Sequence, residues 1–483
     1  MTQTDMLIGG TRVQAEGGRT FERRNPIDQQ LATVAPAASV ADARKAVDAA
    51  ADALGAWAAT GPGERRALLN RAADALQARH ASLTRAIMAE TGASAIWSDF
   101  NVRLAVNMLR EAAALTTQIQ GQTIPSDTAG LLSMAVRQPA GVVLGMAPWN
   151  APLILGVRAL AVPLACGNTV VFKGSEVCPA THAEIVQAFC DAEFPAGVVN
   201  FVTNAPADAG PIVEAMIAHP ALRRVNFTGS TRVGKIIAAT CAKYLKPSVL
   251  ELGGKAPALV LDDADLDDAV NGVAFGAFAN SGQICMSTER IIVDQDIADA
   301  FIEKLVAKVR GLPQGDPRNG PVVLGSVVDM ATVERCNRLI DDALAKGARL
   351  LCGGSADTTL MPATLLDHVT AEMAIYHEES FGPVKPIVRV RGEAQAIACA
   401  NDNAYGLSSA IFTGDLARGW RVAGQIQLGI CHVNGATVHD EAQMPFGGVK
   451  DSGWGRFGGQ AGIDAFTDLR WVTLQTSARH YPF

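Results

Sequence analysis

The chain has 483 residues and a formal net charge of −7, and 49% of its residues are hydrophobic, 18% charged and 5% aromatic. This length exceeds what one hydrophobic core supports, so we expect about two or three domains, and the mild negative charge argues against general affinity for nucleic acid or acidic membranes. Nine cysteines without CxxC pairs or Cys/His clusters argue against a disulfide scaffold or a metal site, and indicate a reducing cytoplasm.

The N-terminal region has the pattern of helices. Residues 39–57 and 62–91 are rich in Ala, Leu and Arg, with apolar side chains every three to four positions. Another helix is predicted over 98–118. The segment 121–125 then interrupts the helical pattern, and 131–138 alternates in the manner of an exposed strand.

The most apolar stretch of the chain, 144–172, is interrupted by prolines and by Asn150, Arg158 and Asn168. These residues predict a buried loop, helix and strand instead of a membrane span. Residues 1–5 contain neither a basic nor an apolar run, so no signal peptide is expected.

Short β-branched runs follow from Gly141 onward. Those alternating with helices in the first half predict buried parallel strands, hence a doubly wound α/β sheet that binds a nucleotide: 142–144, 169–172, 198–201 and 224–227. A second α/β series is predicted after Glu251, with strands at 258–261, 290–293 and 387–390. The tail, 471–476, alternates like a strand that covers a sheet edge or pairs with another subunit.

Two motifs favour a dinucleotide. Residues 227–234, Phe-Thr-Gly-Ser-Thr-Arg-Val-Gly, follow a predicted strand and open a predicted helix, where backbone N–H groups meet a pyrophosphate. Lys173 and Glu176 follow another strand, at the edge where ribose hydroxyls bind, and a carboxylate at Glu176 repels a 2′-phosphate, which favours NAD over NADP. The alternatives are a plain strand–helix turn and a solvated ion pair.

Cys285, in Ser-Gly-Gln-Ile-Cys-Met-Ser, and Glu251, before Leu-Gly-Gly-Lys, suggest covalent catalysis by a thiol with a carboxylate base. Asn150 is predicted to donate its amide to an oxyanion. Glu379 is expected to hold the nicotinamide ribose in preference to Glu378, with Phe381 near the ring. Taken singly, a cysteine is more often a buried apolar residue, as we expect of the other eight, a glutamate a surface charge and an asparagine a cap.

These stretches, together with Pro445–Lys450 and Ser452-Gly453, resemble the aldehyde dehydrogenase superfamily of the NAD(P)-dependent, non-phosphorylating kind, from end to end of the chain. The resemblance implies a Rossmann-type NAD-binding domain (1–120 and 141–250), an α/β catalytic domain (251–450) and a small β oligomerisation arm (121–140 and 460–483). It implies a homodimer or dimer of dimers, and catalysis through Cys285, Glu251 and Asn150. The expected cofactor-binding residues are Trp149, Lys173, Glu176, Gly229, Ser230, Gly234, Leu252, Glu379 and Phe381.

Within the superfamily the sequence is most similar to bacterial salicylaldehyde, benzaldehyde and vanillin dehydrogenases. This resemblance is based on residues 92–97, the apolar neighbours of Cys285 and the terminal residues 481–483. Ala151 stands where relatives acting on small aliphatic aldehydes carry Phe, which leaves room for a ring. Asn150, Ile154 and Arg158 recur at helical spacing, so Arg158 either meets a ring substituent or is ion-paired inside the domain. The expected substrate pocket comprises Trp97, Ala151, Ile154, Arg158, Ile284, Met286 and Phe446; His439 is ambiguous between this pocket and a surface loop.

Three other activities remain open. An aliphatic aldehyde or semialdehyde dehydrogenase would use the same mechanism. A CoA-acylating aldehyde dehydrogenase is disfavoured by Glu251, because those relatives tend to lack this base. Thioester or ester hydrolysis is expected only as a side activity, and a non-catalytic binding protein is improbable because thiol, base, oxyanion donor and ribose ligands are all present.

Overall fold

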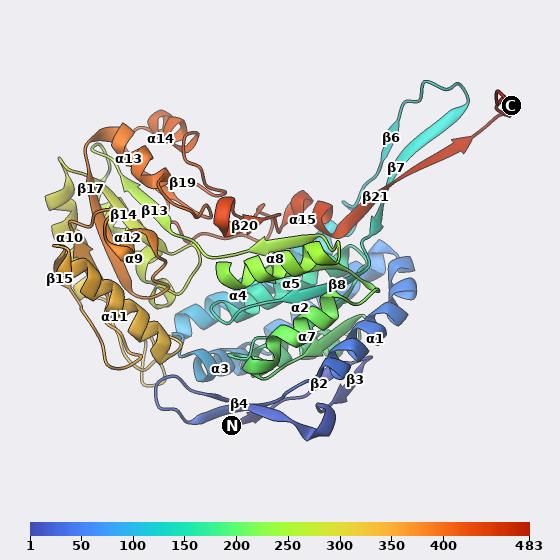
Figure 1. Cartoon of the computed structure of the whole chain (residues 1–483), viewed down its shortest axis with the longest axis horizontal. Helices are drawn as coiled ribbons and strands as arrows, with labels where there is room; N and C mark the ends of the chain where they lie inside the picture. The colour runs from blue at the N-terminus through green and yellow to red at the C-terminus, as the bar shows by residue number, and fades with distance from the viewer.

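Two large sheets and a projecting arm organise the molecule, whose computed structural model describes residues 1–483. Figure 1 shows a lobe around each large sheet and an arm of strands that leaves the body and carries the C-terminus at its tip. A small sheet of order β1-β5-β4 covers the N-terminal side, from strands Thr2–Gln3, Leu31–Pro36 and Thr20–Arg24. The fold is therefore mixed α/β, as predicted.

The first large sheet has eight strands in the order β20-β12-β11-β8-β9-β10-β2-β3. Its strands are Gly453–Trp454, Ser248–Glu251, Leu222–Thr228, Val142–Met146, Thr169–Lys173, Val199–Val202, Met6–Ile8 and Thr11–Val13. The pairs from β12 through β10 are all parallel, which confirms the four predicted strands. The other three pair antiparallel at the edges. Of these, β2 and β3 flank the tight Gly9-Gly10 turn and were not predicted.

Helices cover both faces of this sheet. They are α1 (Val40–Ala59), α2 (Pro62–Ala78), α3 (His80–Thr91), α4 (Ala95–Leu115), α5 (Pro152–Ala165), α6 (Pro179–Asp191), α7 (Ala209–Ile217) and α8 (Thr231–Lys243). Alternate residues of β9 face opposite sides: Val170 and Phe172 pack with α5 and α6, whereas Val171 packs with α1 and α7. The stretch 144–172 is thus a strand, loop, helix and strand inside the body, and no helix of the chain has the length and apolarity to cross a membrane.

The predicted helical boundaries differ from the observed ones at two places. The run 62–91 divides at Arg79, whose backbone leaves the helical region and whose side chain pairs with Glu184 and Asp191 of α6. The helix predicted over 98–118 begins earlier, because Ser94 Oγ accepts a hydrogen bond from Trp97 N and caps α4.

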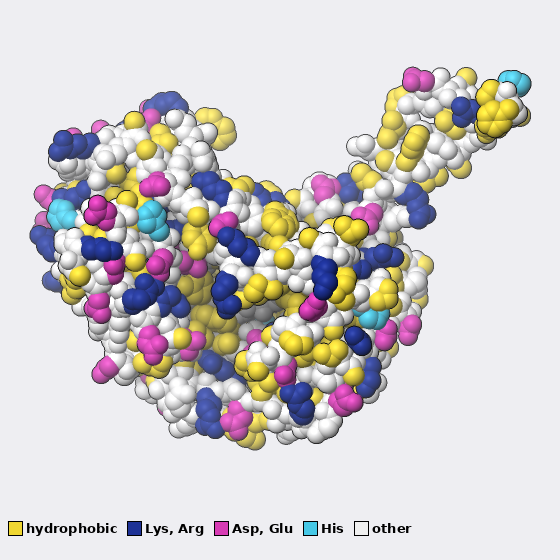
Figure 2. Space-filling view, viewed as in Figure 1, with side chains coloured by type: hydrophobic (Ala, Val, Ile, Leu, Met, Phe, Trp, Pro, Cys, Tyr) yellow, Lys and Arg dark blue, Asp and Glu magenta, His cyan; other side chains and the backbone are white.

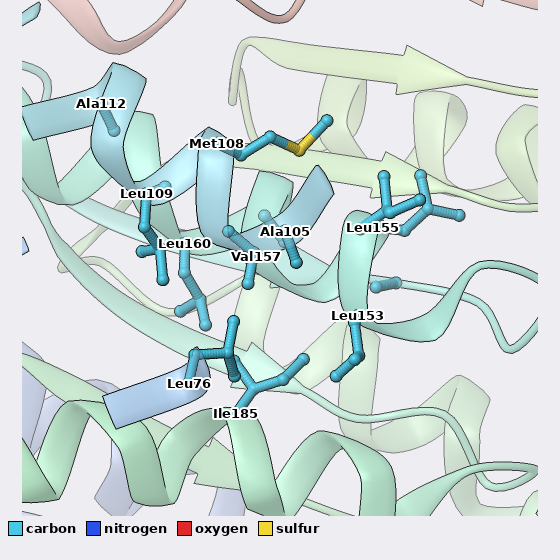
Figure 3. Packing of buried hydrophobic residues seen from close by; sticks show 14 of the residues in the cluster. Leu76, Ala105, Met108, Leu109, Ala112, Leu153, Leu155, Val157, Leu160 and Ile185 are labelled. Carbon is cyan, nitrogen blue, oxygen red and sulfur yellow. The ribbon is translucent and has the colours of Figure 1, made fainter. Parts of the chain in front are cut away.

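The largest core cluster lies between α2, α4, α5 and α6 (Figure 3). Leu76, Leu109, Leu160 and Ile185 come from these four helices in turn and are all fully buried. Truncating such a leucine to alanine costs about 2–5 kcal/mol, because the close-packed surroundings do not refill the space. Leu153 and Leu155 in the first turn of α5 belong to the same cluster, so this layer also holds the N-terminal end of α5.

The second large sheet has seven strands in the order β15-β16-β17-β14-β13-β18-β19. They are Arg349–Cys352, Thr364–Asp367, Val384–Val390, Thr288–Asp294, Ala256–Val260, Ala410–Phe412 and His432–Val433. All neighbours are parallel except β15 and β16, and β13, β14 and β17 are the three strands predicted. One face packs on α9 (Leu266–Phe278) and α10 (Ala298–Arg310). The other packs on α11 (Met330–Ala345), α12 (Ala374–His377), α13 (Gly392–Asn401) and α14 (Leu416–Ala423).

The arm is a three-stranded antiparallel sheet of order β21-β7-β6. Strand β21 (Thr467–Gln475) follows α15 (Gly459–Phe466) and pairs along its whole length with β7 (Leu131–Pro139), and β6 (Gln122–Ile124) pairs with β7 on its other side. The predicted C-terminal strand is present and begins a few residues earlier than expected. Figure 2 shows hydrophobic side chains along the arm and a hollow in the face between the two lobes.

Candidate active site

A left-handed turn presents Cys285. Asn280, Ser281 and Gly282 have φ values of 48°, 55° and 74°, just before the loop that carries the thiol. A side chain at position 282 would place its Cβ 2.2 Å from the carbonyl oxygen of Gly382, so only glycine fits there. The turn stores backbone strain that the surrounding contacts must hold.

The side chain of Gln283 fixes this turn. Its Nε2 donates to the carbonyls of Asn280 at 3.2 Å and Ser326 at 3.3 Å, and its Oε1 accepts from Val328 N at 2.9 Å. Because Gln283 is buried, these bonds are shielded from water. Gln283 therefore links the loop bearing Cys285 both to the preceding turn and to the segment 326–328.

Asn150 lies against the same loop. Its Nδ2 donates to the carbonyl of Gln283 at 3.0 Å, and its own carbonyl accepts from Asn280 Nδ2 at 2.9 Å and Trp97 Nε1 at 2.9 Å. An amide nitrogen carries two hydrogens, so one remains for an oxygen bound near Cys285. Asn150 and Cys285 line the same cavity.

This cavity has a volume of about 250 Å³, and all seven residues predicted for the substrate pocket line it. Most of its wall is apolar, and the side chains that sequence reasoning missed are Phe100, Leu104, Leu155, Phe275, Val438 and Asp440. Phe100 and Leu104 follow Trp97 at helical spacing on α4, so that stripe was a usable signal. His439 lines the cavity and is also half-exposed, hydrogen-bonded to Glu441.

Arg158 is both ion-paired and at the cavity wall. Its Nη2 donates to Asp440 Oδ2, and both side chains are 6% exposed. The guanidinium carbon lies 4.3 Å from the ring centroid of Phe446, within cation–π range. The two alternatives posed by the sequence thus coexist in one residue.

Glu251 ends strand β12 beside the glycines of two motifs. Neither of its carboxyl oxygens has a hydrogen-bond partner, and the side chain is buried. An added Cβ at Gly447 would lie 2.8 Å from Glu251 Oε1, so this close approach depends on glycine. Burial raises the pKa of Glu251 to about 8, against the opposing charges of Arg158 and Arg456. Such a carboxyl is suited to accept a proton near neutral pH.

The thiol of Cys285 is partly exposed to the cavity but lies among acidic groups. Burial raises its pKa to about 12, and the charges of Glu251, Glu379 and Asp440 add to this effect while that of Arg158 opposes it. In the free protein the thiol therefore holds its proton and needs a base to react as the thiolate. Of the other eight cysteines, expected to be buried, Cys190 is exposed and Cys352 and Cys431 are partly exposed.

The predicted ribose ligands meet at the carboxyl end of β9. Lys173 Nζ pairs with Glu176 Oε1, which also accepts from Asn204 Nδ2 at 2.8 Å. Burial opposes ionisation of Glu176, but the charge and hydrogen bond of Lys173, together with the hydrogen bond from Asn204, lower the pKa of the carboxyl. Asn204 was missed by sequence reasoning, and its Oδ1 is buried without a partner, a polar atom suited to a ligand.

The predicted pyrophosphate motif caps α8. Ser230 Oγ accepts from Val233 N at 3.4 Å at the N-terminus of the helix, next to Gly229. A Cβ at Gly234 would come within 2.3 Å of Leu252, so glycine allows the helix to pack directly on the Glu251 motif. This arrangement leaves backbone N–H groups and a helix N-terminus at the edge of the sheet, which fits a dinucleotide.

The remaining predicted cofactor residues are Glu379, Trp149 and Phe381, and Glu379 contacts the Glu251 motif directly. Glu379 Oε1 accepts from Gly254 N at 2.8 Å, and burial raises its pKa to about 7. The rings of Trp149 and Phe381 meet edge to face at 5.8 Å. Glu378, by contrast, is half-exposed and pairs with Arg338.

A buried charge cluster supports the Glu379 loop. Glu289 accepts from Lys255 Nζ at 2.8 Å, Lys385 Nζ at 2.7 Å and Ser380 N at 2.8 Å. Although burial alone would raise it, the two lysines lower the pKa of Glu289 to about 2. The cluster ties the Glu251, Cys285 and Glu379 segments to one another, and sequence reasoning missed it.

A profile described as the aldehyde dehydrogenase family matches residues 13–472. The chain is 58% identical to a vanillin dehydrogenase of Pseudomonas fluorescens and 49% identical to a salicylaldehyde dehydrogenase of Pseudomonas sp. (strain C18), each over 100% of both chains. Its structure superposes with a TM-score of 0.99 and 48% identity on a salicylaldehyde dehydrogenase from Pseudomonas putida G7 complexed with salicylaldehyde, covering 100% of each chain.

Proposed function

The chain belongs to the aldehyde dehydrogenase family, and from this premise we propose that it oxidises aromatic aldehydes to carboxylic acids with NAD as the cofactor. The enzyme is an oxidoreductase acting on the aldehyde group, and the family uses NAD or NADP. Vanillin and salicylaldehyde, the substrates named for its relatives, are the first compounds we assign to it.

The observation that carries the proposal is the cavity at Cys285. Its wall is apolar and aromatic, with Trp97 and Phe100 stacked at 5.4 Å between ring centroids. The small side chain of Ala151 beside Asn150 leaves width for a ring. Aromatic walls with few polar groups bind planar apolar ligands well, and they favour benzaldehydes over short aliphatic aldehydes.

We assign the first chemical step to Cys285 and Asn150. Glu251 takes the proton of the thiol, directly or through water, and the thiolate attacks the carbonyl carbon to give a thiohemiacetal. The free Nδ2 hydrogen of Asn150 and the backbone N–H of Cys285 stabilise the developing oxyanion. Because both donors are anchored by the Gln283 network, they need little reorganisation in the transition state.

The second half of the reaction belongs to Glu251. The cofactor, when bound, supplies a hydride acceptor, so that the thiohemiacetal becomes a thioester. Glu251 then removes a proton from water, which attacks the thioester carbonyl and releases the carboxylic acid and the thiol. A raised pKa and unpartnered oxygens support this role, because such a carboxylate is basic and free to bind water.

We assign NAD to the first lobe, residues 1–120 and 141–250, and catalysis to residues 251–450. An ionised Glu176 beside Lys173 supports NAD, since the carboxylate accepts ribose hydroxyls and repels a 2′-phosphate. Gly229, Ser230 and Gly234 would meet the pyrophosphate, and Glu379 with Phe381 the nicotinamide riboside.

We assign the arm, residues 121–140 and 460–483, to pairing with a second copy of the chain. Its exposed large apolar side chains support this role: Ile124, Leu132, Val136, Leu469, Trp471 and Leu474. An apolar patch of this kind on a projecting ribbon usually marks an interface. Light scattering of the chain and of a Trp471→Arg variant tests it, since a monomer in both would contradict the assignment.

The direct test of the function is NADH formation followed by absorbance. Values of kcat/KM are compared for salicylaldehyde, vanillin, benzaldehyde and hexanal, with NAD or NADP and without CoA. We expect the aromatic aldehydes and NAD to be preferred. A preference for hexanal would overturn the aromatic assignment but keep the dehydrogenase, and a strict need for CoA would make the enzyme CoA-acylating.

A further inference from the structure

The wall of the cavity at Cys285 carries one positive and one negative side chain, which form an ion pair. Arg158 and Asp440 are the only acidic or guanidinium side chains that line it, and they are paired with each other. Arg158 comes from α5 and Asp440 from the loop after β19, so the pair joins segments 282 residues apart. The carboxylate thus sets the net charge that a substrate meets.

The carboxylate of Asp440 is paired with Arg158 and has no other hydrogen-bond partner. Its Oδ1 is buried without a hydrogen-bond partner, and its Oδ2 accepts from Arg158. A buried carboxylate costs free energy unless a nearby cation compensates it, and here that cation is Arg158. The pair therefore acts as a unit at the cavity wall.

The charge of this ion pair affects substrate binding, because a bound aldehyde must lie in the same cavity. The carbonyl carbon has to contact Sγ of Cys285, so the rest of the aldehyde fills the cavity that Arg158 and Asp440 help to line. Arg158 without Asp440 would offer an uncompensated cation to any carboxylate on the substrate. Burial is the main cause of the raised pKa of Cys285, and the pair acts on the same thiol, since Arg158 lowers this pKa and Asp440 raises it.

We propose that Asp440 is a specificity-determining residue, which neutralises Arg158 and thereby makes the cavity select uncharged aldehydes over aldehydes that bear a carboxylate. This inference rests on the proposed aldehyde oxidation and adds the charge class of the substrate. A unit charge a few ångströms from a bound anion changes its binding by more than about tenfold at the effective dielectric of a protein site.

The first experiment compares two substrates of nearly equal shape, 4-formylbenzoate and 4-formylbenzamide. The unmodified enzyme should prefer the amide in kcat/KM. Asp440→Asn should shift the ratio toward the carboxylate by about tenfold or more. The shift should disappear in the double variant Arg158→Met/Asp440→Asn, because the gain depends on the freed guanidinium. An unchanged ratio in folded Asp440→Asn overturns the proposal.

Glu441→Gln is the matched control. It removes one negative charge from the same loop, but Glu441 is exposed and bonded to His439 and Gln443. The substrate ratio should stay within about twofold, as expected for an exposed charge. A shift as large as that of Asp440→Asn would mean that general loop charge sets the ratio, and would overturn the specific role of Asp440.

The second experiment needs neither NAD nor turnover. Alkylation of Cys285 by iodoacetate is compared with alkylation by iodoacetamide, each rate being divided by that of a free thiol. The unmodified protein should favour iodoacetamide, and Asp440→Asn should raise the iodoacetate share. If the variant does not fold, the test uses the unmodified protein alone. The proposal is then overturned if its relative rate of alkylation by iodoacetate equals or exceeds that by iodoacetamide. A failure of aromatic aldehyde oxidation with the expected alkylation ratios would overturn the proposed function alone.

Discussion

The indole Nε1 of Trp97 donates a hydrogen bond of 2.9 Å to the backbone carbonyl of Asn150. The same carbonyl accepts a second bond from Asn280, in the left-handed turn before Cys285. One wall of the substrate cavity, the proposed oxyanion donor and the thiol loop are therefore connected through a single carbonyl oxygen. The shape of the cavity and the geometry of the oxyanion site are not independent of each other.

Trp97→Phe should reduce kcat for benzaldehyde by about 2- to 10-fold, the range expected for one lost hydrogen bond. The matched control is Trp57→Phe, because Trp57 lies in the same core cluster and its buried Nε1 has no partner. Steady-state kinetics of both variants provide the check. Equal losses in the two would mean that packing, and not the bond to Asn150, is responsible.

Deacylation should depend on the ionisation of Glu251. Its pKa is raised to about 8, and the deprotonated form is the active base, so the deacylation rate should rise as pH increases toward 8 and level off above it. Glu251→Gln should abolish this rise and reduce turnover by about 10²- to 10⁴-fold. Rapid-mixing measurements of the NADH burst and of the later steady rate separate the two steps. A deacylation rate that stays flat from pH 6 to 9 in the unmodified enzyme contradicts the role.

Arg158→Leu should destabilise the protein by about 3–5 kcal/mol, because it leaves Asp440 buried without its cation. The double variant Arg158→Leu/Asp440→Leu should recover most of this loss, measured by chemical denaturation. Where the single variant is folded, oxidation of salicylaldehyde should fall more than that of benzaldehyde. Equal losses for both substrates would exclude a contact between Arg158 and the ring hydroxyl.

Glu176→Gln should raise kcat/KM with NADP relative to NAD, because the neutral amide no longer repels a 2′-phosphate while it still accepts from Asn204. Glu184→Gln serves as the control, since that carboxylate lies on α6 and pairs with Arg79. Cofactor titrations at fixed aldehyde concentration give both ratios. An unchanged ratio in Glu176→Gln removes this residue from the ribose site.

Gly254→Ala should impair folding or activity severely, because the added Cβ would lie 2.3 Å from the carbonyl oxygen of Cys285. Backbone at that distance has no flexible end that can move aside. Gly210→Ala is the matched control: it lies in the first turn of α7 with nothing within 4 Å of the new Cβ, and should leave folding and activity intact. Thermal unfolding and NADH formation report on both variants.

Four strands of the first large sheet were predictable, and two of them, 142–144 and 169–172, are unbroken apolar or β-branched runs. Residues 169–173 are buried on both faces of the sheet, and such a strand has no polar alternation to obscure it. Strand 222–228 is less uniform, because Arg223 is exposed while Arg224 and Asn226 are buried. The short strand that ends at Glu251 was not predicted, because it holds only four residues and lies near the sheet edge. The break at Arg79 was equally hidden, since it depends on ion pairs with α6.

The pocket residues were predictable where they share one helix. Ile154 and Arg158 lie one turn apart on α5, Asn150 precedes the helix by two residues, and all three line the cavity. Asp440 had no comparable signal, because it lies in an irregular loop and its position is defined by a partner 282 residues away. A contact between a loop and a helix far apart in the sequence follows from tertiary packing, which the local pattern does not encode.

The arm also has a consequence for the order in which the chain folds. The indole of Trp471 in β21 donates to Ser133 Oγ in β7, across 338 residues of sequence. During synthesis β7 leaves the ribosome long before its partner strand exists, so one long edge of that strand stays unpaired until the chain is complete. Such an edge invites pairing with other nascent chains. Pairing of β21 with β7 therefore comes last in the folding of the chain. We expect chains truncated before β21 to aggregate even when both lobes have folded.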